Sequence, residues 1–281
     1  QQVTHSEIGD FTIKLDTRLL AQKSYRKVFK KLGIDIQSVE IDDKKMADVL
    51  ENVLKQISTD FVPYEIVTPP VPMDKLHILE DLRSDLFKNK AKGTRASMLY
   101  AFATHINPEM PEISLNYIMK YLKAFFLLLP WLHEKTEIDF SRKVPPFINP
   151  FSERYIHHVL HPEYNPNTEL FVKDYHEHNP NRNRPLDLYP VLGFLNPQLI
   201  DNLEGIGNVK TRPTLHYRLP NCLIDEPGWT LAQEWNLWVY VEKMACLENL
   251  SEWCEKYNTL RKKTWFGFKN KWISKIEKWA G

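Results

Sequence analysis

The chain is poor in cysteine and glycine, and each shortage excludes a class of protein. Its 281 residues include 3 cysteines and 9 glycines, beside 19 prolines. An odd number of cysteines, with no pair at metal-ligand spacing, indicates reduced thiols in a cytoplasmic protein and not a secreted disulfide framework. So little glycine argues against flexible linkers and low-complexity segments.

Long apolar runs are missing as well. The longest, Ala124–Leu132, contains Pro130 and is far too short to cross a membrane. No signal peptide is visible, and the chain begins at Gln1 and not at a methionine, as expected of a trimmed or partial chain. We therefore expect a cytoplasmic protein with no membrane partner.

An excess of charge of one sign is also absent. The 37 lysines and arginines face 36 acidic residues, so the net charge is +1. No overall field attracts nucleic acid, and we expect none as a partner. What the chain does have is apolar residues, at 43% of the total. At this length they suffice to hide roughly three quarters of the unfolded surface in a core.

Alternating polar and apolar residues predict a half-buried antiparallel sheet. In the first such segment Phe11, Ile13 and Leu15 point to one side, and the polar residues between them point to the other. The segments with this period of two are Phe11–Arg18, Pro63–Val67, Met98–Asn107 and Arg212–Leu219.

Helical patterns fill the gaps between these strands. Amphipathic stretches cover 46–57 and 75–87, and Ser114 is a predicted N-cap. Thr230 and Gln233 have the spacing of a capping box, whereas the proline- and asparagine-rich region 141–190 predicts short helices at most. The expected fold class is α+β, an antiparallel sheet with one polar concave face and helices packed on the other.

The polar faces of the strands carry side chains that suit a metal–nucleotide site. Carboxylates bind divalent metals, and guanidinium and amide groups hold phosphate oxygens. The residues in question are Asp16, Glu65, His105, Asn107, His216 and Arg218. A solvated sheet face explains any one strand about equally well, but the agreement of all of them favours a site for phosphoryl transfer.

Several stretches, in this order, resemble motifs of the amidoligase enzyme family, which is similar to glutamine synthetase and glutamate–cysteine ligase. Residues 61–70 (FVPYEIVTPP), 101–108 (AFATHINP) and 179–187 (NPNRNRPLD) match the family pattern, and 212–221 (RPTLHYRLPN) resembles an arginine-bearing strand of glutamine synthetase. The likeness extends from Gly9 to about Glu248. It implies a domain of residues 1–249 followed by a helical extension, 250–281.

The resemblance implies a glutamine-synthetase-like fold and a carboxylate–amine ligase that uses ATP and magnesium through an acyl-phosphate. It assigns the metal to Glu65 and Asp16. Catalytic contacts would come from His105, Arg182, Arg184, His216 and Arg218, and cofactor contacts from Asn107, Asn183 and Arg212. The partners implied are a small-molecule or peptide carboxylate and an amine, and the oligomeric state is not indicated.

Two departures from the family pattern keep other functions open. His216 stands where the resembling glutamine synthetase strand has a glutamate, and the Gly-x-Glu-x-Glu strand with which the family begins does not precede Gly9. Both favour a non-catalytic binding protein that retains the fold. A third hypothesis, a metal-dependent hydrolase, depends on the histidines at 157, 158, 161, 176 and 178. Their spacing fits no standard zinc pattern, and we interpret them as surface residues.

Overall fold

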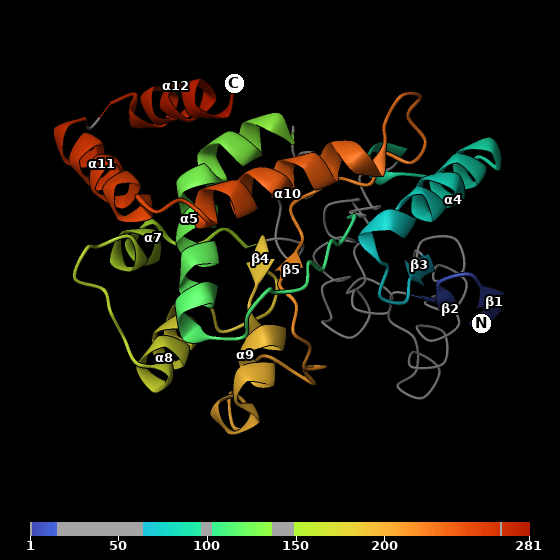
Figure 1. The fold of residues 1–281 in the computed structure, drawn as a ribbon, viewed down its shortest axis with the longest axis horizontal. Helices are drawn as coiled ribbons and strands as arrows, with labels where there is room; N and C mark the ends of the chain where they lie inside the picture. Colours follow the sequence, from blue (N-terminus) through green and yellow to red (C-terminus); the bar gives the residue numbers. More distant parts are fainter. Residues whose placement is uncertain (1, 16–63, 97–102, 137–148, 265) are drawn as a thin grey trace, which may run out of the picture. The chain divides into compact units, whose positions relative to one another are not determined.

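The computed structural model describes residues 2–15, 64–96, 103–136, 149–264 and 266–281 (Figure 1). The chain divides into two compact units, one of residues 1–102 with 223–227 and one of 103–222 with 228–281. The helix expected at 46–57 and the predicted metal ligand Asp16 lie outside the described residues.

The first unit contains a three-stranded antiparallel sheet. Its order is β1 (Gln2–Ser6), β2 (Gly9–Leu15), β3 (Tyr64–Val67). Phe11 is buried and Thr12 is exposed, so this part of β2 alternates as predicted. Tyr64, expected on the apolar face of its strand, is 70% exposed. The strand predictions for 11–18 and 63–67 are confirmed over β2 and β3.

The helix predicted at 75–87 is α4 (His77–Lys88). It follows η2 (Met73–Lys75) and precedes η3 (Thr94–Ala96). Arg95 Nη1 lies 2.8 Å from Glu226 Oε1, and this ion pair holds the segment 223–227 to the unit.

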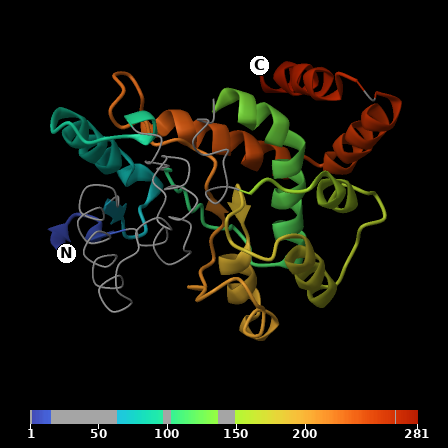
Figure 2. The same ribbon diagram turned by 180° about the vertical axis from the view of Figure 1, so that it is seen from behind.

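Helix α5 (Leu115–Lys135) is the centre of the second unit. The Ser114 side chain accepts a hydrogen bond from the backbone N of Tyr117 at 3.3 Å, which confirms the predicted N-cap. Twelve of the 21 residues of α5 are buried, so neighbours cover it on nearly every side. Pro130 has no N–H for the carbonyl of Phe126, and α5 changes direction in both Figure 1 and Figure 2.

Three C-terminal helices pack against α5: α10 (Leu231–Ala245), α11 (Leu250–Lys263) and α12 (Phe268–Ala280). The capping box of Thr230 and Gln233 opens α10 as predicted. The fully buried Trp272 of α12 donates its indole N–H to the carbonyl of Leu127 at 2.7 Å. Among the described helices none has the length and apolar composition to span a membrane. Helix α11 begins at the predicted boundary of 249/250, and the domain assignment itself stays a prediction.

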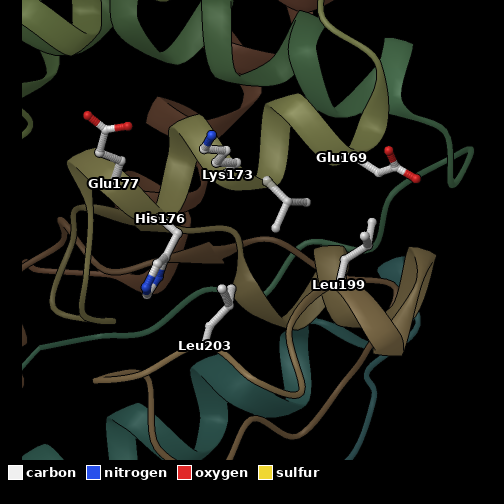
Figure 3. Close-up of a pocket in the computed structure, with 7 residues that line it drawn as sticks. Glu169, Lys173, His176, Glu177, Leu199 and Leu203 are labelled. Carbon is white, nitrogen blue, oxygen red and sulfur yellow. The ribbon is translucent and has the colours of Figure 1, made fainter.

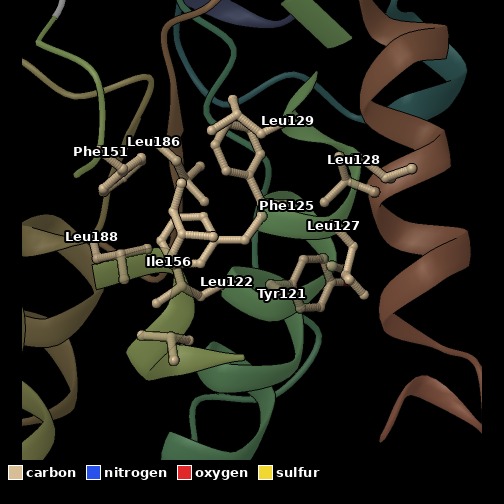
Figure 4. Close-up of a cluster of buried hydrophobic side chains, with 14 of the residues drawn as sticks. Tyr121, Leu122, Phe125, Leu127, Leu128, Leu129, Phe151, Ile156, Leu186 and Leu188 are labelled. Atoms are coloured by element: carbon tan, nitrogen blue, oxygen red, sulfur yellow. The ribbon is translucent and has the colours of Figure 1, made fainter. Parts of the chain in front are cut away.

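The region 149–200 folds into short helices, in line with the prediction for its described part. They are α7 (Glu153–Val159), α8 (Thr168–His178), α9 (Tyr189–Leu195) and η4 (Pro197–Leu199). Figure 4 shows Phe125 of α5 among Phe151, Ile156 and Leu186. Burying each of these apolar side chains contributes about 1.5–3 kcal/mol relative to leaving it exposed.

The strands of the second unit are much shorter than predicted. β4 (Leu186–Asp187) pairs antiparallel with β5 (His216–Tyr217), and the residues from 103 to 109 meet 214–221 only at isolated bridges. Prolines 108 and 220 lie in these segments, prolines 185 and 213 directly precede them, and each lacks the N–H that a longer ladder needs.

The expectation of one sheet carrying all the site residues is therefore wrong for the described part of the chain. Glu65 belongs to the sheet of the first unit, and His216 belongs to that of the second. The α+β class is confirmed, in a mostly helical form. Helices do cover the apolar side of the 212–219 segment, because Phe125 of α5 packs edge-on against Tyr217 with ring centroids 6.1 Å apart.

Candidate functional site

The segment 214–219 separates an apolar side from a polar side. Leu215, Tyr217 and Leu219 have no exposed area, whereas His216 and Arg218 between them are half-buried. Alternation along an extended chain therefore sends His216 and Arg218 away from the core. We call the side that they occupy the polar face.

Two neighbouring segments add residues to this face through the backbone register. Ile106 pairs with Tyr217, and their N–H and C=O groups exchange hydrogen bonds at 3.0 and 2.8 Å. Since paired residues share a side of the sheet, His105 and Asn107 flank Ile106 on the polar face. On the other edge Asp187 of β4 is the direct partner of His216.

Arg182 reaches the polar face from the loop between α8 and β4. Its Nε donates to Asp187 Oδ2 at 2.9 Å, and its backbone carbonyl accepts a hydrogen bond from Arg218 Nη1 at 2.6 Å. The loop is shaped by Asn181, whose Oδ1 accepts from the backbone N of Asn183 at 3.0 Å. Arg218 is thus linked to Arg182 through a backbone carbonyl, and Arg182 is bonded in turn to the carboxylate of Asp187.

Asp187 is a buried carboxylate at the centre of this group. Its side chain is 1% exposed, and its Oδ1 accepts from the backbone N of Tyr189 at 3.1 Å. Burial raises the pKa of Asp187, while the positive charges of Arg182 and Arg218 act in the opposite direction. Hydrogen bonds and positive charges from neighbouring protein groups therefore stabilise the carboxylate.

His216 is held neutral by its surroundings. Burial, and then the charges of Arg182, Arg218 and Arg212, lower its pKa from 6.5 to about 3. Its Nδ1 lies 3.7 Å from Asp187 Oδ2, and its Nε2 is buried with no hydrogen-bond partner in the described part of the chain. An imidazole in this state adds no positive charge beside the arginines and has a lone pair to offer.

Arg184 lies in the same loop but faces the protein interior. Its guanidinium donates to the backbone carbonyls of Asn149, Pro150 and His178, at 3.4, 2.6 and 3.3 Å. It is 8% exposed. These bonds give Arg184 a structural part in joining two loops, and the catalytic role predicted for it stays a prediction.

The other predicted residues are spread more widely. The backbone carbonyl of Asn183 accepts from the backbone N of Asn149 at 2.6 Å, and the backbone N–H of exposed Arg212 donates to the carbonyl of Pro190 at 3.0 Å. Glu65 lies in the first unit, opposite Lys14 in the backbone register. The second unit thus brings together His105, Asn107, Arg182, His216 and Arg218, whereas Glu65 belongs to the first unit and Asp16 lies outside the described residues.

The histidines between 157 and 178 form separate local contacts. His158 Nε2 lies 3.2 Å from Asp174 Oδ2, and His176 Nδ1 lies 2.7 Å from the hydroxyl of Tyr189. His176 and His178 are half-buried and not fully at the surface as expected. In the described residues, no group of three or more histidine, cysteine or acidic side chains is arranged to hold a metal ion.

A shallow hollow lies beside α8, away from the predicted site residues. It has a volume of about 420 Å³, an apolar floor of Val172, Leu199 and Leu203, and charged side chains at its edge. Figure 3 shows Glu169 and Glu177 projecting from α8 around it. None of the residues predicted for the site lines this hollow.

Asp187 is the member of the polar face to which the sequence assigned no role. It closes the NPNRNRPLD stretch, and it lies between Leu186 and Leu188, which are fully buried. A lone acidic residue between two apolar ones in a short strand is the signal that could have identified it, since a buried carboxylate needs a partner.

Comparison with known proteins identifies a family. A family model described as "Putative amidoligase enzyme" matches residues 1–240. No curated protein and no solved structure matches the chain.

Proposed function

The chain belongs to this amidoligase family, and we propose that it joins a carboxylate to an amine in a reaction that uses ATP and magnesium. The polar face of the second unit is the proposed site, on a glutamine-synthetase-like catalytic fold. The observation that carries the proposal is the linked pair of arginines. Arg218 is bonded to the carbonyl of Arg182, and Arg182 is bonded to a buried carboxylate.

The proposed chemistry has two steps. A carboxylate oxygen of the first substrate attacks the γ-phosphorus of ATP, the bond to ADP breaks, and an acyl-phosphate forms. The nitrogen of the amine then attacks the acyl carbon, phosphate leaves with the electrons of the broken bond, and the nitrogen loses a proton. ATP supplies the phosphoryl group that turns the carboxylate oxygen into a good leaving group.

The arginines are suited to the charge that develops in both steps. Arg182 and Arg218 present guanidinium donors in a fixed geometry, and such preorganised donors stabilise transferring phosphoryl groups. Neutral His216 leaves the positive charge to the arginines and offers its Nε2 lone pair. His105, Asn107 and Arg212 are the proposed further contacts to phosphate or carboxylate.

Magnesium would be held by Glu65 and Asp16 in this proposal. Their carboxylate oxygens are ligands that magnesium prefers, and the ion would neutralise phosphate charge. Glu65 lies in the first unit and Asp16 lies outside the described residues. We therefore derive no step of the reaction from the metal.

A second candidate function is ligand binding without catalysis. The observation that favours it is His216, a neutral imidazole in a strand that resembles the glutamine synthetase strand with a glutamate at this position. A binding protein of this kind would hold a nucleotide or a carboxylate on the arginines without releasing ADP.

Calorimetry with ATP and magnesium tests the site, and ADP release tests catalysis. We expect the wild-type protein to bind ATP and to gain about 2.7 kcal/mol of stability at a hundredfold excess over Kd. Arg182→Lys should lose binding, because a lysine cannot reach both Asp187 and a phosphate with the same geometry. Arg154→Lys, at an exposed arginine of α7, is the matched control and should bind normally.

The outcomes separate the two candidates. ADP release that requires both a carboxylate and an amine supports the ligase. ATP binding without release, across a panel of such substrates, supports the binding protein. No heat at millimolar ATP and magnesium would rule out a nucleotide site on the polar face.

A further inference from the structure

Asp187 makes two contacts through a single oxygen atom. Its Oδ2 accepts from Arg182 Nε at 2.9 Å and lies 3.7 Å from His216 Nδ1. Oδ1 is engaged by the backbone N of Tyr189 at 3.1 Å. With 1% of its side chain exposed, Asp187 has little surface with which to contact a ligand itself. Asp187 can therefore affect a ligand only indirectly, through the positions of Arg182 and His216.

Asp187 Oδ2 lies 3.7 Å from His216 Nδ1, beyond hydrogen-bond distance, so its negative charge and not a hydrogen bond favours one neutral form of the ring. A neutral imidazole has one N–H, and a carboxylate beside Nδ1 attracts that proton to Nδ1. The lone pair is then on Nε2, which has no hydrogen-bond partner in the described part of the chain. Without the carboxylate, nothing in these contacts favours this tautomer over the other.

The contact with Arg182 determines where its guanidinium lies. Nε is bound to Asp187, and Nη1 lies 3.4 Å from the carbonyl of Asn208, so the plane of the group is defined from two sides. The carbonyl of the same residue accepts from Arg218 Nη1 at 2.6 Å. A shift of the Arg182 backbone would therefore disturb Arg218 as well.

We propose that Asp187 is a positioning residue of the phosphate-binding face, which orients the guanidinium of Arg182 and fixes the proton of His216 on Nδ1. The inference rests on the proposed function for the nature of the ligand, and on the geometry of the second unit for the positioning. It assigns to Asp187 a part that neither the family motifs nor the predicted site residues include.

Simple electrostatics predicts the opposite effect of removing this charge. A carboxylate among arginines lowers the local positive potential, so its neutralisation alone would tighten the binding of an anion. Loss of the orientation of the Arg182 guanidinium and the His216 ring would instead weaken the binding of the anion. Asp187→Asn keeps the size of the side chain and removes the charge, so the sign of the change in ATP affinity separates the two explanations.

The experiment compares wild type, Asp187→Asn and Asp174→Asn by calorimetry with ATP and magnesium, well below their melting temperatures. Asp174 of α8 is the matched control, because its replacement changes the net charge equally while its partners are His158 and Tyr164. We expect Asp187→Asn to weaken ATP binding about tenfold, the effect typical of one lost hydrogen bond to a charged group, and Asp174→Asn to leave it unchanged. Unchanged or tighter binding in Asp187→Asn would overturn the proposal.

Nitrogen NMR of the His216 ring gives a second readout that needs no ligand. The wild-type protein should show a protonated Nδ1 and an unprotonated Nε2, and Asp187→Asn should show a mixture of tautomers. If Asp187→Asn does not fold, the wild-type spectrum still decides, because a proton on Nε2 contradicts the proposal. If wild type binds no ATP, the proposed function fails, and the comparison of the two ring spectra still tests the positioning.

Discussion

The polar face and the histidine-rich helices α7 and α8 both carry side chains capable of chemistry, but their local contacts differ. On the polar face, His216 has a buried Nε2 with no hydrogen-bond partner among the residues that the structure describes, and Asp187 is 1% exposed beside Arg182. On α7 and α8, His158 pairs with Asp174, a carboxylate that also accepts from Tyr164 at 3.0 Å. His178 Nδ1 is bonded to the backbone of its own helix at 3.0 Å.

The difference shows that residue type does not distinguish a site from a set of structural contacts. Both regions contain imidazoles and a carboxylate. The helical histidines are bonded to a carboxylate, a tyrosine or the backbone of their own helix, whereas the polar face places two arginines and a histidine around a buried carboxylate. Buried groups with perturbed pKa values and a defined geometry are what binding and catalysis require.

The largest expected effect is on the polar face, in Arg218→Lys. A lysine keeps part of the packing but loses the planar fork that meets two phosphate oxygens. We expect turnover to fall a hundred- to thousandfold, or about 3–4 kcal/mol, with little change in melting temperature. Steady-state kinetics and thermal denaturation measure the two quantities. Near-normal turnover would show that Arg218 is only a structural contact.

Arg184→Leu should have the next largest effect, on stability and not on binding. The substitution removes the guanidinium that donates hydrogen bonds to three backbone carbonyls. We expect the free energy of unfolding to fall by about 2–3 kcal/mol, as measured in urea. ATP affinity of the folded protein should stay close to that of wild type. A large loss of affinity with unchanged stability would instead support the catalytic role predicted from the sequence.

His216 should make stability depend on pH. Its pKa is about 3 in the folded state, so it stays neutral there, while in the unfolded chain it gains a proton below pH 6.5. Its contribution is thus fully present above pH 6.5 and is lost as the pH falls toward 3. Between pH 7 and pH 5 this amounts to about 2 kcal/mol.

The pH prediction is checked by urea denaturation at both pH values. Wild type should lose about 2 kcal/mol more than His216→Asn over this interval, since asparagine does not titrate. Because the comparison is a difference between two proteins, the other histidines and carboxylates largely cancel. An equal loss in both would mean that His216 titrates alike in the folded and unfolded states.

The smallest expected effect is in the histidine-rich region, in His158→Asn. The side chain is 44% exposed, and its carboxylate partner keeps a bond from Tyr164. We expect a change of at most about 1 kcal/mol in the free energy of unfolding and no change in ATP affinity. A strong loss of ATP binding would show that the two regions act together and that the contrast between them is wrong.

Local signals were sufficient for three features of the described helices, although the long helix expected from Thr230 to Trp253 divides into α10 and α11. The N-cap at Ser114, the capping box of Thr230 with Gln233, and helix α4 follow from residues within a few positions of each other. The alternation of β2 and of 214–219 likewise identified which side chains face the core. These features were predictable because the backbone groups that they satisfy lie close in sequence.

The sequence by itself determined the family and the residue types of the site, since motifs carry both. The tertiary structure alone decided that Arg218 is bonded to the backbone carbonyl of Arg182 and that the side chain of Arg184 faces the interior. It also decided that Glu65 lies in a different sheet from His216. Arg182 and Arg184 are two residues apart in one loop, and no local rule distinguishes them. Their roles depend on groups distant in the chain, a carboxylate on β4 for one and carbonyls at 149–150 for the other, and only folding brings these together.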